Sequence, residues 1–342
     1  MKRILIVSEE KEQSRGIIKM LDSKSIDVST AVNYTAAIEQ AKKEKPDLII
    51  CDINEYKLFH LLSKSPKTLG IPILFLTEKA EKSTVRKSMN LTTDNYLLTP
   101  IDKQELLDII AIHFKRSELT KKKYARNKQG LIDFIETAST FNLPFKVTAN
   151  LKTERFSADD SIYNTGKESD KVFMLVAGKV KSISNSPSGK EVVHVYKKGD
   201  FFGFKDILAN TKRSESVVSM GNAEVIVIPK ADFLSLVYST KYVSEKLVKI
   251  LTGGKEKEEK KLLKDVNSSL KKQVANMFVM LRNKFDRSLD LVYSNDEMAS
   301  MAGISIEFLL QTLTEFRKKK LIEIDGRAIK IVNSKELEKI GK

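Results

Sequence analysis

Residues 294–332 read SNDEMASMAGISIEFLLQTLTEFRKKKLIEIDGRAIKIV and carry the most specific structural signal in the chain. Ser294 and Glu297 match a capping box, so a short helix is predicted to begin there. Ser305 caps a second helix, and two alternating strands follow around an Asp325-Gly326 turn. Helix, tight turn, helix and hairpin in this order predict a winged helix-turn-helix.

The composition bounds the class of protein. The chain has 342 residues, too many for one ordinary core, with 41% hydrophobic and 31% charged residues, which is typical of a soluble globular protein. Cys51 is the single cysteine, which excludes a disulfide framework, and His60, His113 and His194 lack metal-ligand spacing. No apolar run approaches the ~20 residues of a membrane helix, and the run after Met1 is too short for a signal peptide. We therefore expect a cytoplasmic protein with no membrane contact.

The net charge of +15, from 60 basic and 45 acidic residues, is a reason to consider nucleic acid as a partner. The largest local excess lies between Lys115 and Lys128, outside the predicted helix-turn-helix. Two interpretations of this basic run stay open: a solvated helix face, or a patch that contacts phosphates.

Apolar runs alternate with amphipathic stretches in the first third of the chain. Strands are predicted at 3–7, 47–51, 71–76 and 95–98, and helices at 13–21 and 103–114. This alternation predicts a doubly wound parallel sheet, whose site lies at the carboxyl ends of the strands. The polar residues expected at that edge include Ser8, Glu9, Asp52, Thr77 and Thr99.

These residues, within KRILIVSEE, PDLIICDI, IPILFLTEKA and DNYLLTPID, resemble those of two-component receiver domains. The resemblance implies that Asp52 accepts a phosphoryl group and that Glu9 and Asp52 help to hold Mg²⁺. It also implies that Thr77 contacts the phosphoryl oxygens, that Tyr96 is the aromatic switch residue, and that a sensor histidine kinase is a partner.

The site departs from the receiver pattern. Ser8 stands where an acid is usual, Thr99 replaces the lysine, and Glu78 follows Thr77 where a small residue is usual. Each change makes an acyl phosphate less favourable. Two interpretations stay open: Asp52 is phosphorylated, or the domain is a degenerate receiver that docks or dimerises without phosphorylation.

Short strands with frequent glycines follow in the middle of the chain, at 172–176, 192–196 and 225–228, and predict a small β-barrel or sandwich. The stretch KGDFFG (198–203) and the later Arg213-Ser214 resemble the cyclic-nucleotide-binding β-roll of Crp/Fnr regulators. The resemblance implies a ligand pocket in which backbone N–H groups and a guanidinium face a cyclic phosphate. Its residues are Gly203, Phe204, Arg213 and Ser214.

Phe204 departs from the nucleotide-binding pattern, because a glutamate there holds the ribose hydroxyl in nucleotide-binding members. The run GDFFGFKDI is more similar to the Fnr-type branch, whose iron–sulfur centre needs several cysteines, and only Cys51 is present. We therefore do not expect cyclic nucleotide as a cofactor, and predict a degenerate sensor roll.

An apolar stripe at helical spacing runs from Val243 to Leu251, is interrupted at Gly253-Gly254, and resumes at Leu262. In the Crp/Fnr family this long helix joins two chains, which implies a homodimer. The interruption is either a movable joint or a loose end.

The C-terminal stretch resembles the Crp-type winged helix-turn-helix. Its second helix is predicted to present Ile306, Glu307, Phe308 and Gln311 to the major groove, and Ser305, Lys318 and Arg327 are predicted phosphate contacts. The arginine that commonly reads guanine is missing from this helix. An alternative is that Ile306 and Phe308 form an exposed patch that binds protein.

The predicted order is a receiver-like domain (1–115), a basic linker (116–142), a β-roll (143–242), a dimerisation helix (243–267) and a winged helix-turn-helix (268–342). This architecture predicts a homodimeric transcriptional regulator that binds double-stranded DNA. An enzyme is not expected, since the sequence offers no nucleophile–base pair, metal cluster or P-loop. The alternative function is a signalling adaptor that acts through protein–protein contacts without DNA.

Overall fold

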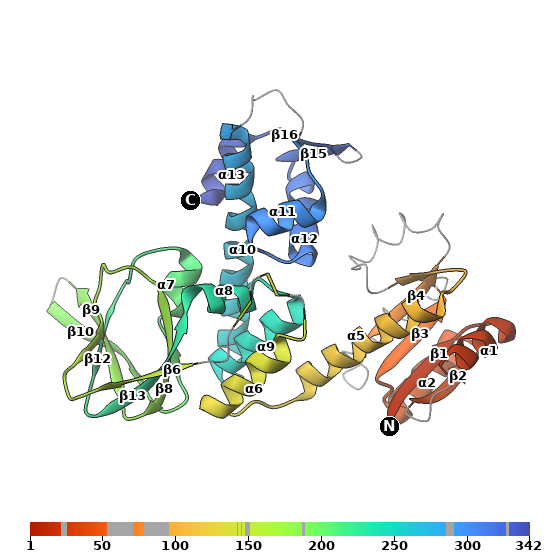
Figure 1. Cartoon of the computed structure of the whole chain (residues 1–342), viewed down its shortest axis with the longest axis horizontal. Helices are drawn as coiled ribbons and strands as arrows, with labels where there is room; N and C mark the ends of the chain where they lie inside the picture. Colours follow the sequence, from red (N-terminus) through yellow and green to blue (C-terminus); the bar gives the residue numbers. More distant parts are fainter. Residues whose placement is uncertain are drawn as a thin grey trace. The chain divides into compact units, whose positions relative to one another are not determined.

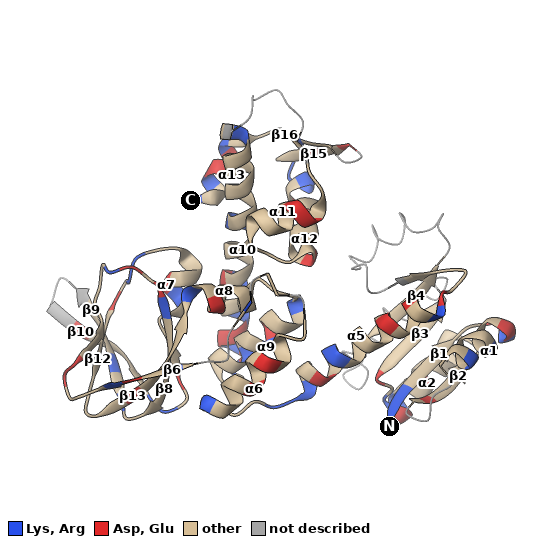
Figure 2. Cartoon of the chain, in the orientation of Figure 1, with Lys and Arg blue, Asp and Glu red and all other residues tan. Residues whose placement is uncertain are grey.

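The computed structural model describes residues 1–21, 26–52, 71–77, 96–141, 143–144, 146–147, 151–186, 189–284, 291–325 and 328–342. The chain divides into two compact units, Met1–Lys121 and Lys122–Lys342 (Figure 1). The boundary lies inside the predicted basic linker, whose lysines are visible in Figure 2 between the helices labelled α5 and α6.

The first unit is the predicted doubly wound parallel sheet. Its strands are β1 (Lys2–Val7), β2 (Ile26–Ala31), β3 (Leu48–Asp52), β4 (Ile73–Thr77) and β5 (Tyr96–Leu98), in the order β2-β1-β3-β4-β5. Its described helices are α1 (Lys11–Met20), α2 (Tyr34–Glu44) and α5 (Lys103–Lys121). The predicted strands and helices are confirmed, while β2 and α2 were not singled out from the sequence.

Alternation along the central strands divides the core into two layers. Leu5 and Val7 of β1 pack in one cluster with Ala37 and Ala41 of α2. Ile4 and Ile6 belong to a second cluster, which also contains residues of α1 and α5. Because both faces of the sheet are covered, the central strands β1, β3 and β4 carry continuous apolar runs, whereas the edge strand β2 also carries Asp27, Ser29 and Thr30.

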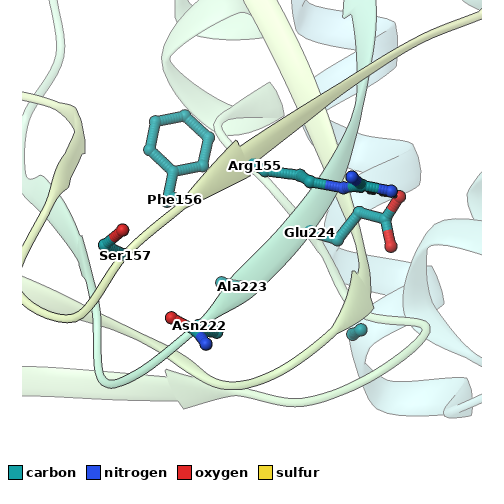
Figure 3. A pocket seen from close by; sticks show the side chains of 7 residues that line it. Arg155, Phe156, Ser157, Asn222, Ala223 and Glu224 are labelled. Atoms are coloured by element: carbon teal, nitrogen blue, oxygen red, sulfur yellow. Dashed lines mark ion pairs between the residues drawn. The ribbon is translucent and has the colours of Figure 1, made fainter.

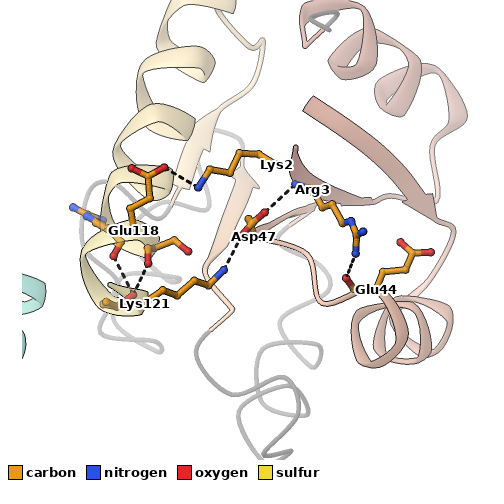
Figure 4. A network of polar contacts seen from close by, with 9 residues as sticks. Lys2, Arg3, Glu44, Asp47, Glu118 and Lys121 are labelled. Atoms are coloured by element: carbon orange, nitrogen blue, oxygen red, sulfur yellow. Dashed lines mark hydrogen bonds and ion pairs between the residues drawn. The ribbon is translucent and has the colours of Figure 1, made fainter. Parts of the chain in front are cut away.

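The last turns of α5 are tied to the base of this sheet through Asp47 (Figure 4). The Asp47 carboxylate accepts from Lys121 Nζ at 2.7 Å and from the Arg3 backbone N–H at 3.0 Å, and Lys2 pairs with Glu118 at 2.9 Å. Burial raises the pKa of Asp47, but the hydrogen bonds from Lys121 and Arg3 outweigh it and leave the pKa below its usual value.

The second unit contains a β-roll of two four-stranded antiparallel sheets, β10-β9-β12-β7 and β11-β8-β13-β6. The strands are β6 (Lys152–Phe156), β7 (Ser161–Tyr163), β8 (Lys171–Ala177), β9 (Val180–Ser186), β10 (Gly189–Tyr196), β11 (Phe201–Phe202), β12 (Ser216–Ser219) and β13 (Ala223–Pro229). Phe173, Phe202 and Val225 belong to its buried core. The roll confirms the predicted small β-barrel or sandwich.

Helices adjoin the roll. They are α6 (Lys128–Ala138), α7 (Phe204–Ala209), α8 (Lys230–Val237), α9 (Lys241–Thr252) and α10 (Glu256–Lys284). The predicted linker is therefore partly helical, and α10 crosses the predicted boundary at residue 267 without interruption. Gly253 and Gly254, with φ of 66° and 80°, separate α9 from α10, as the interruption in the apolar pattern predicted.

The apolar stripe of the broken helix is buried within the chain itself. Val243 and Leu247 of α9 are 0% and 2% exposed, and Leu262 and Val266 of α10 are 5% and 2% exposed. Helix α9 contacts both α8 and α10. The residues expected to face a second chain are therefore covered in this conformation, and the homodimer stays a prediction.

The C-terminal part is the predicted winged helix-turn-helix, followed by one further helix. It comprises β14 (Leu291–Val292), α11 (Asn295–Ala302), α12 (Ile306–Lys318), β15 (Ile322–Asp325), β16 (Ala328–Ile331) and α13 (Ser334–Gly341). The capping box is formed: the Ser294 hydroxyl accepts from the Glu297 N–H, and the Glu297 carboxylate accepts from the Ser294 N–H. Helix α13 packs against α10, where Arg282 pairs with Glu338 at 3.1 Å. No helix in the described part of the chain is long and apolar enough to span a membrane.

The Asp47 contacts lead to a stability prediction. Asp47→Asn removes the charge that holds Lys121, and we expect it to lower the free energy of unfolding of the first unit by about 1 kcal/mol at pH 7. Because the folded-state pKa is depressed, this stabilisation is present at neutral pH and is lost as the pH falls below about 3.9 and through the folded-state value. The measurement is hydrogen exchange of β1 and β3 amides in urea at pH 7 and near pH 3.

The matched control is Asp27→Asn, because Asp27 forms a more exposed pair with the same residue, Arg3, at 3.9 Å. We expect the control to change the free energy of unfolding by less than about 0.5 kcal/mol. Equal effects of the two variants would contradict the role given to Asp47.

Candidate nucleic-acid interface and sensor sites

The parallel register brings the predicted receiver residues to one edge of the sheet. Val7 of β1 is in register with Cys51, Asp52 with Leu76, and Thr77 with Leu98. Thr99 lies directly after β5, where its N–H donates to the Thr77 carbonyl at 3.0 Å. The side chains of Asp52 and Tyr96, and the whole of Glu78, lie outside the described residues.

The Ser8 side chain forms hydrogen bonds at the start of α1. Its hydroxyl donates to Gln13 Oε1 at 2.7 Å and accepts from the Glu10 N–H at 3.1 Å. Ser8 is 5% exposed, whereas Glu9 is exposed to solvent. The residue at the usual position of the first acid therefore serves local structure.

The described residues do not form a magnesium cage at this edge. Mg²⁺ prefers an octahedral set of oxygens with one or two carboxylates among them. Among the residues that the structure describes, no three of His, Cys, Asp and Glu gather closely enough to hold a metal ion. Of the two predicted ligands, Glu9 has a described side chain, and it is exposed.

The ligand-pocket residues of the roll do lie together, but Arg213 is used internally. Its Nη1 donates to the Gly203 carbonyl at 2.6 Å and its Nη2 to the Lys171 carbonyl at 2.5 Å. The guanidinium carbon lies 4.2 Å from the centroid of the Tyr163 ring, and Arg213 is 2% exposed. The cation predicted to face a phosphate is therefore buried and bonded to backbone carbonyls.

The other two pocket side chains are also engaged within the chain. The Ser214 hydroxyl donates to Asp206 Oδ1 of α7 at 2.7 Å. Phe204 is 8% exposed, and its ring lies 6.5 Å from that of Phe233 on α8. Phe204 thus belongs to the core between α7 and α8.

Aromatic rings pack in the interior of the roll beside Arg213. The Tyr163 ring stacks on Phe173 at 5.7 Å, Phe173 stacks on Phe202 at 5.3 Å, and Phe202 lies 5.1 Å from Tyr196. Burial raises the pKa of the Tyr163 phenol above its ordinary value, which is the direction expected for a ring packed in an apolar core. This packing favours an occupied core over a ligand cavity.

A shallow pocket lies elsewhere on the roll, at the ends of β6 and β13 (Figure 3). Its lining residues are Arg155, Phe156, Ser157, Ala177, Asn222, Ala223 and Glu224. Arg155 and Glu224 approach to 3.8 Å across it. None of the predicted ligand-pocket residues lines it, so it does not correspond to the predicted sensor site.

The second helix of the helix-turn-helix, α12, has one buried and one exposed face. Ile306, Gln311 and Lys318 are exposed, as predicted for groove-facing and phosphate-facing residues. Phe308 is 6% exposed, so its predicted exposure is wrong. The reason is the helical period, because Phe308 lies four residues before the buried Thr312 on the core face. Arg327 lies outside the described residues.

The N-terminal end of α12 is bonded to the segment between α8 and α9. The Ser305 N–H donates to the Tyr238 carbonyl and the Ser305 hydroxyl to the Ser239 carbonyl, both at 2.9 Å. The Lys241 N–H donates to the Glu307 carboxylate at 3.4 Å. In helix-turn-helix proteins the N-terminal residues of this helix contact base edges. In the described conformation the N-terminal end of α12 is therefore closed off by the segment between α8 and α9.

Sequence reasoning did not find the residues that form this closure. Tyr238 and Ser239 follow α8 as part of an apolar run, which signals burial but gives no sign of a partner. Ser239 and Ser305 are 66 positions apart, and their hydrogen bond depends on how the roll and the helix-turn-helix pack.

Three family models match successive parts of the chain: a response regulator receiver domain at residues 4–111, a cyclic nucleotide-binding domain at 153–239 and a Crp-like helix-turn-helix domain at 272–340. The CRP-like cAMP-activated global transcriptional regulator of Mycobacterium tuberculosis is 21% identical over 198 residues, which cover 56% of this chain and 88% of that protein. The regulatory protein PhoP of Bacillus subtilis is 31% identical over 121 residues, 34% of this chain and 50% of that protein. The catabolite activator protein of Thermus thermophilus aligns with 61% of this chain and 94% of its own, at a TM-score of 0.29 and 18% identity.

The three domain matches define the class: a signalling domain joined to a β-roll and a DNA-binding module of transcription regulators. Within this class the chain carries a receiver domain, a cyclic nucleotide-binding domain and a Crp-like helix-turn-helix, in the order that its sequence resemblance implied.

The internal role of Arg213 leads to a prediction. Arg213→Ala removes two hydrogen bonds to carbonyls and the stacking on Tyr163, so we expect the free energy of unfolding of the roll to fall by about 2–4 kcal/mol. Hydrogen exchange of β8 and β13 amides in urea measures it. The control is Arg155→Ala, because the Arg155 side chain is 85% exposed. We expect it to lower the free energy of unfolding by less than about 0.5 kcal/mol. An Arg213→Ala roll as stable as the control would instead indicate an arginine held for a ligand.

Proposed function

We propose that this protein is a DNA-binding transcriptional regulator in which α12 enters the major groove. The observation that carries the proposal is the two-faced character of α12. Leu309, Leu313 and Phe316 are buried, while the opposite face exposes Ile306 and Gln311 and ends in basic residues. A major groove admits a helix of this kind.

The exposed residues of α12 have separate roles in this proposal. Gln311 pairs with adenine, and Ile306 contacts a thymine methyl group. Lys318 and Arg327 contact phosphates, which supply affinity and position without sequence information. Ser305 and Glu307 contact DNA once their hydrogen bonds to Ser239 and Lys241 are broken.

DNA binding in this proposal requires the closed end of α12 to open. The hydrogen bonds from Ser305 and to Glu307 occupy the turn of the helix that approaches base edges first. A closed and an open form then exchange, and the measured affinity falls with the fraction of open chains. In this proposal the receiver and the roll control DNA affinity by changing the fraction of open chains.

The open form is a homodimer in this proposal, because two half-sites require two-fold symmetry. The stripe residues Val243, Leu247 and Leu262 become available to a second chain when α9 and α10 separate at Gly253-Gly254. Their burial within the closed chain supports a link between opening and dimerisation.

The receiver acts in this proposal as a degenerate docking domain. Two features support it: the Ser8 hydroxyl bonds Gln13 and Glu10, and Thr99 carries no charge for a phosphoryl group. A sensor histidine kinase is a partner only if Asp52 accepts a phosphoryl group. For the roll, the buried Arg213 supports a structural role without cyclic nucleotide.

The adaptor alternative loses part of its basis. It rested on the departures from the family pattern at all three sites, and one of these was an exposed patch formed by Ile306 and Phe308. Phe308 is buried in the core of the helix-turn-helix. Ile306 by itself, at 39% exposure, is an ordinary surface residue.

The first test incubates the full-length protein with sheared genomic DNA across a salt series and sequences what is retained. We expect a two-fold symmetric motif whose retention weakens steeply with salt, because phosphate contacts release counterions. Retained DNA that shares no sequence motif, or the absence of any retained DNA, would contradict the proposal and favour the adaptor.

Variants of α12 then separate base reading from phosphate contact. Gln311→Ala is expected to weaken binding to the recovered motif by about 5- to 150-fold and to relax preference at one base pair. Lys318→Ala is expected to weaken binding to all DNA sequences alike and to reduce the slope of log affinity against log salt by about 1. Lys335→Ala, an equal charge change on α13, serves as the control. An unchanged motif and affinity in Gln311→Ala would refute the role given to α12.

The receiver proposal has its own test. Full-length protein is incubated with Mg²⁺ and acetyl phosphate and run on a phosphate-affinity gel. We expect no shifted band and no change in DNA affinity. A band that Asp52→Asn abolishes would establish phosphorylation and restore the kinase as a partner.

A further inference from the structure

The segment just after the receiver unit is held in the second unit by Arg126. This residue follows the last residue of α5, Lys121, by five positions. Its Nη2 pairs with Asp200 Oδ1 of the roll at 3.1 Å, and the two side chains are 33% and 20% exposed. The pair is therefore shielded enough to differ from an ordinary surface ion pair.

The same guanidinium lies against the end of α9. A Cβ atom placed on Gly253 would lie 2.6 Å from Arg126 Nη1, so a residue with a side chain would displace this group. Gly253 is the C-cap of α9, with φ of 66°. A helix carries partial negative charge at its C-terminus, so a cation is stabilised there. Arg126 thus contacts the roll and the break in the long helix at once.

Neighbouring residues hold the same segment in place. The Tyr124 ring packs edge-on against Phe134 of α6 at 5.4 Å, and Lys246 Nζ of α9 lies 5.5 Å from the Tyr124 ring centroid. A Cβ atom on Gly199, next to Asp200, would lie 3.0 Å from the Arg126 carbonyl oxygen. The segment is therefore packed between α6, the roll and α9.

Helix α9 joins this contact to the closed end of α12. Arg126 lies at its C-terminal end, whereas Lys241 at its N-terminal end donates to Glu307 of α12. The helix has 12 residues, which makes it about 18 Å long. A short helix of this length moves as a rigid element, so a displacement at Gly253 is transmitted to Lys241.

We infer that Arg126 is a clamp: by holding the Gly253 end of α9 to Asp200 of the roll, it keeps the reading end of α12 closed. The inference rests on the proposed function. The five residues from Lys121 to Arg126 span at most about 18 Å when fully extended. Because this connection is short, a receiver that moves further than that when it docks on a partner pulls Arg126 out of its contact with Asp200. Release frees α9 and opens α12, and a receiver that docks without phosphorylation is sufficient for this.

The test uses full-length Arg126→Ala and two readouts. The Ser305 and Lys241 amides, which donate to Tyr238 and Glu307, report closure by hydrogen exchange. We expect their exchange to rise roughly tenfold, the effect of losing one charge-assisted hydrogen bond. DNA affinity is expected to rise by up to roughly the same factor, because it scales with the fraction of open chains. Arg155→Ala is the control, with neither change.

The outcomes separate the clamp from the proposed function. Faster Ser305 exchange without DNA binding in either protein would uphold the clamp and overturn the DNA-binding proposal. DNA binding with unchanged Ser305 exchange in Arg126→Ala would overturn the clamp and leave the function standing. Faster exchange throughout β8 and β13 would also overturn the clamp, since it would mean general loss of stability.

A second pair of variants tests the contact at Gly253 directly. Gly253→Ala and Gly254→Ala both place a side chain at a positive φ, but only the former abuts Arg126, since the nearest atom to a Cβ on Gly254 is Glu259 Oε1 at 4.0 Å. We expect Gly253→Ala to speed Ser305 exchange more than Gly254→Ala, and this difference to vanish in the Arg126→Ala background. A difference that persists there would overturn the clamp.

Discussion

The closed form of the second unit depends on the break between α9 and α10. Gly253 and Gly254 both have positive φ, which L-residues adopt only at a cost of roughly 1–2 kcal/mol. The break lets α9 contact α10 within one chain, so the apolar stripe of the long helix is covered without a second subunit. At the other end of α9, the Lys241 N–H donates to Glu307 of α12.

The departures from the family patterns share a physical consequence. In the receiver, the Ser8 hydroxyl bonds Gln13; in the roll, Arg213 bonds the Gly203 carbonyl and Ser214 bonds Asp206. Buried polar groups need partners, and the chain itself supplies those of the Ser8 and Ser214 hydroxyls and of both terminal nitrogens of Arg213, while Arg213 Nε is buried without a hydrogen-bond partner among the described residues. Residues at positions that resemble ligand sites therefore make internal contacts in this conformation.

Much of the fold was predictable because it follows from short-range periodicity. The buried run in β1, the turn-rich strands of the roll and the capping box at Ser294 each reflect a few neighbouring residues. The predicted exposure of Phe308 was wrong because a residue in the first turn of α12 does not have to lie on the exposed face of that helix. Its place four residues before Thr312 put it on the buried face.

Local patterns and motifs predict the three domain types, the break at Gly253-Gly254 and the candidate positions at each site. Which of these groups are available to a partner depends on the packing of distant segments. Arg126 and Asp200 are 74 positions apart, and Ser239 and Ser305 are 66 apart. Contacts of this separation depend on how whole elements pack, and no local period along the chain encodes them.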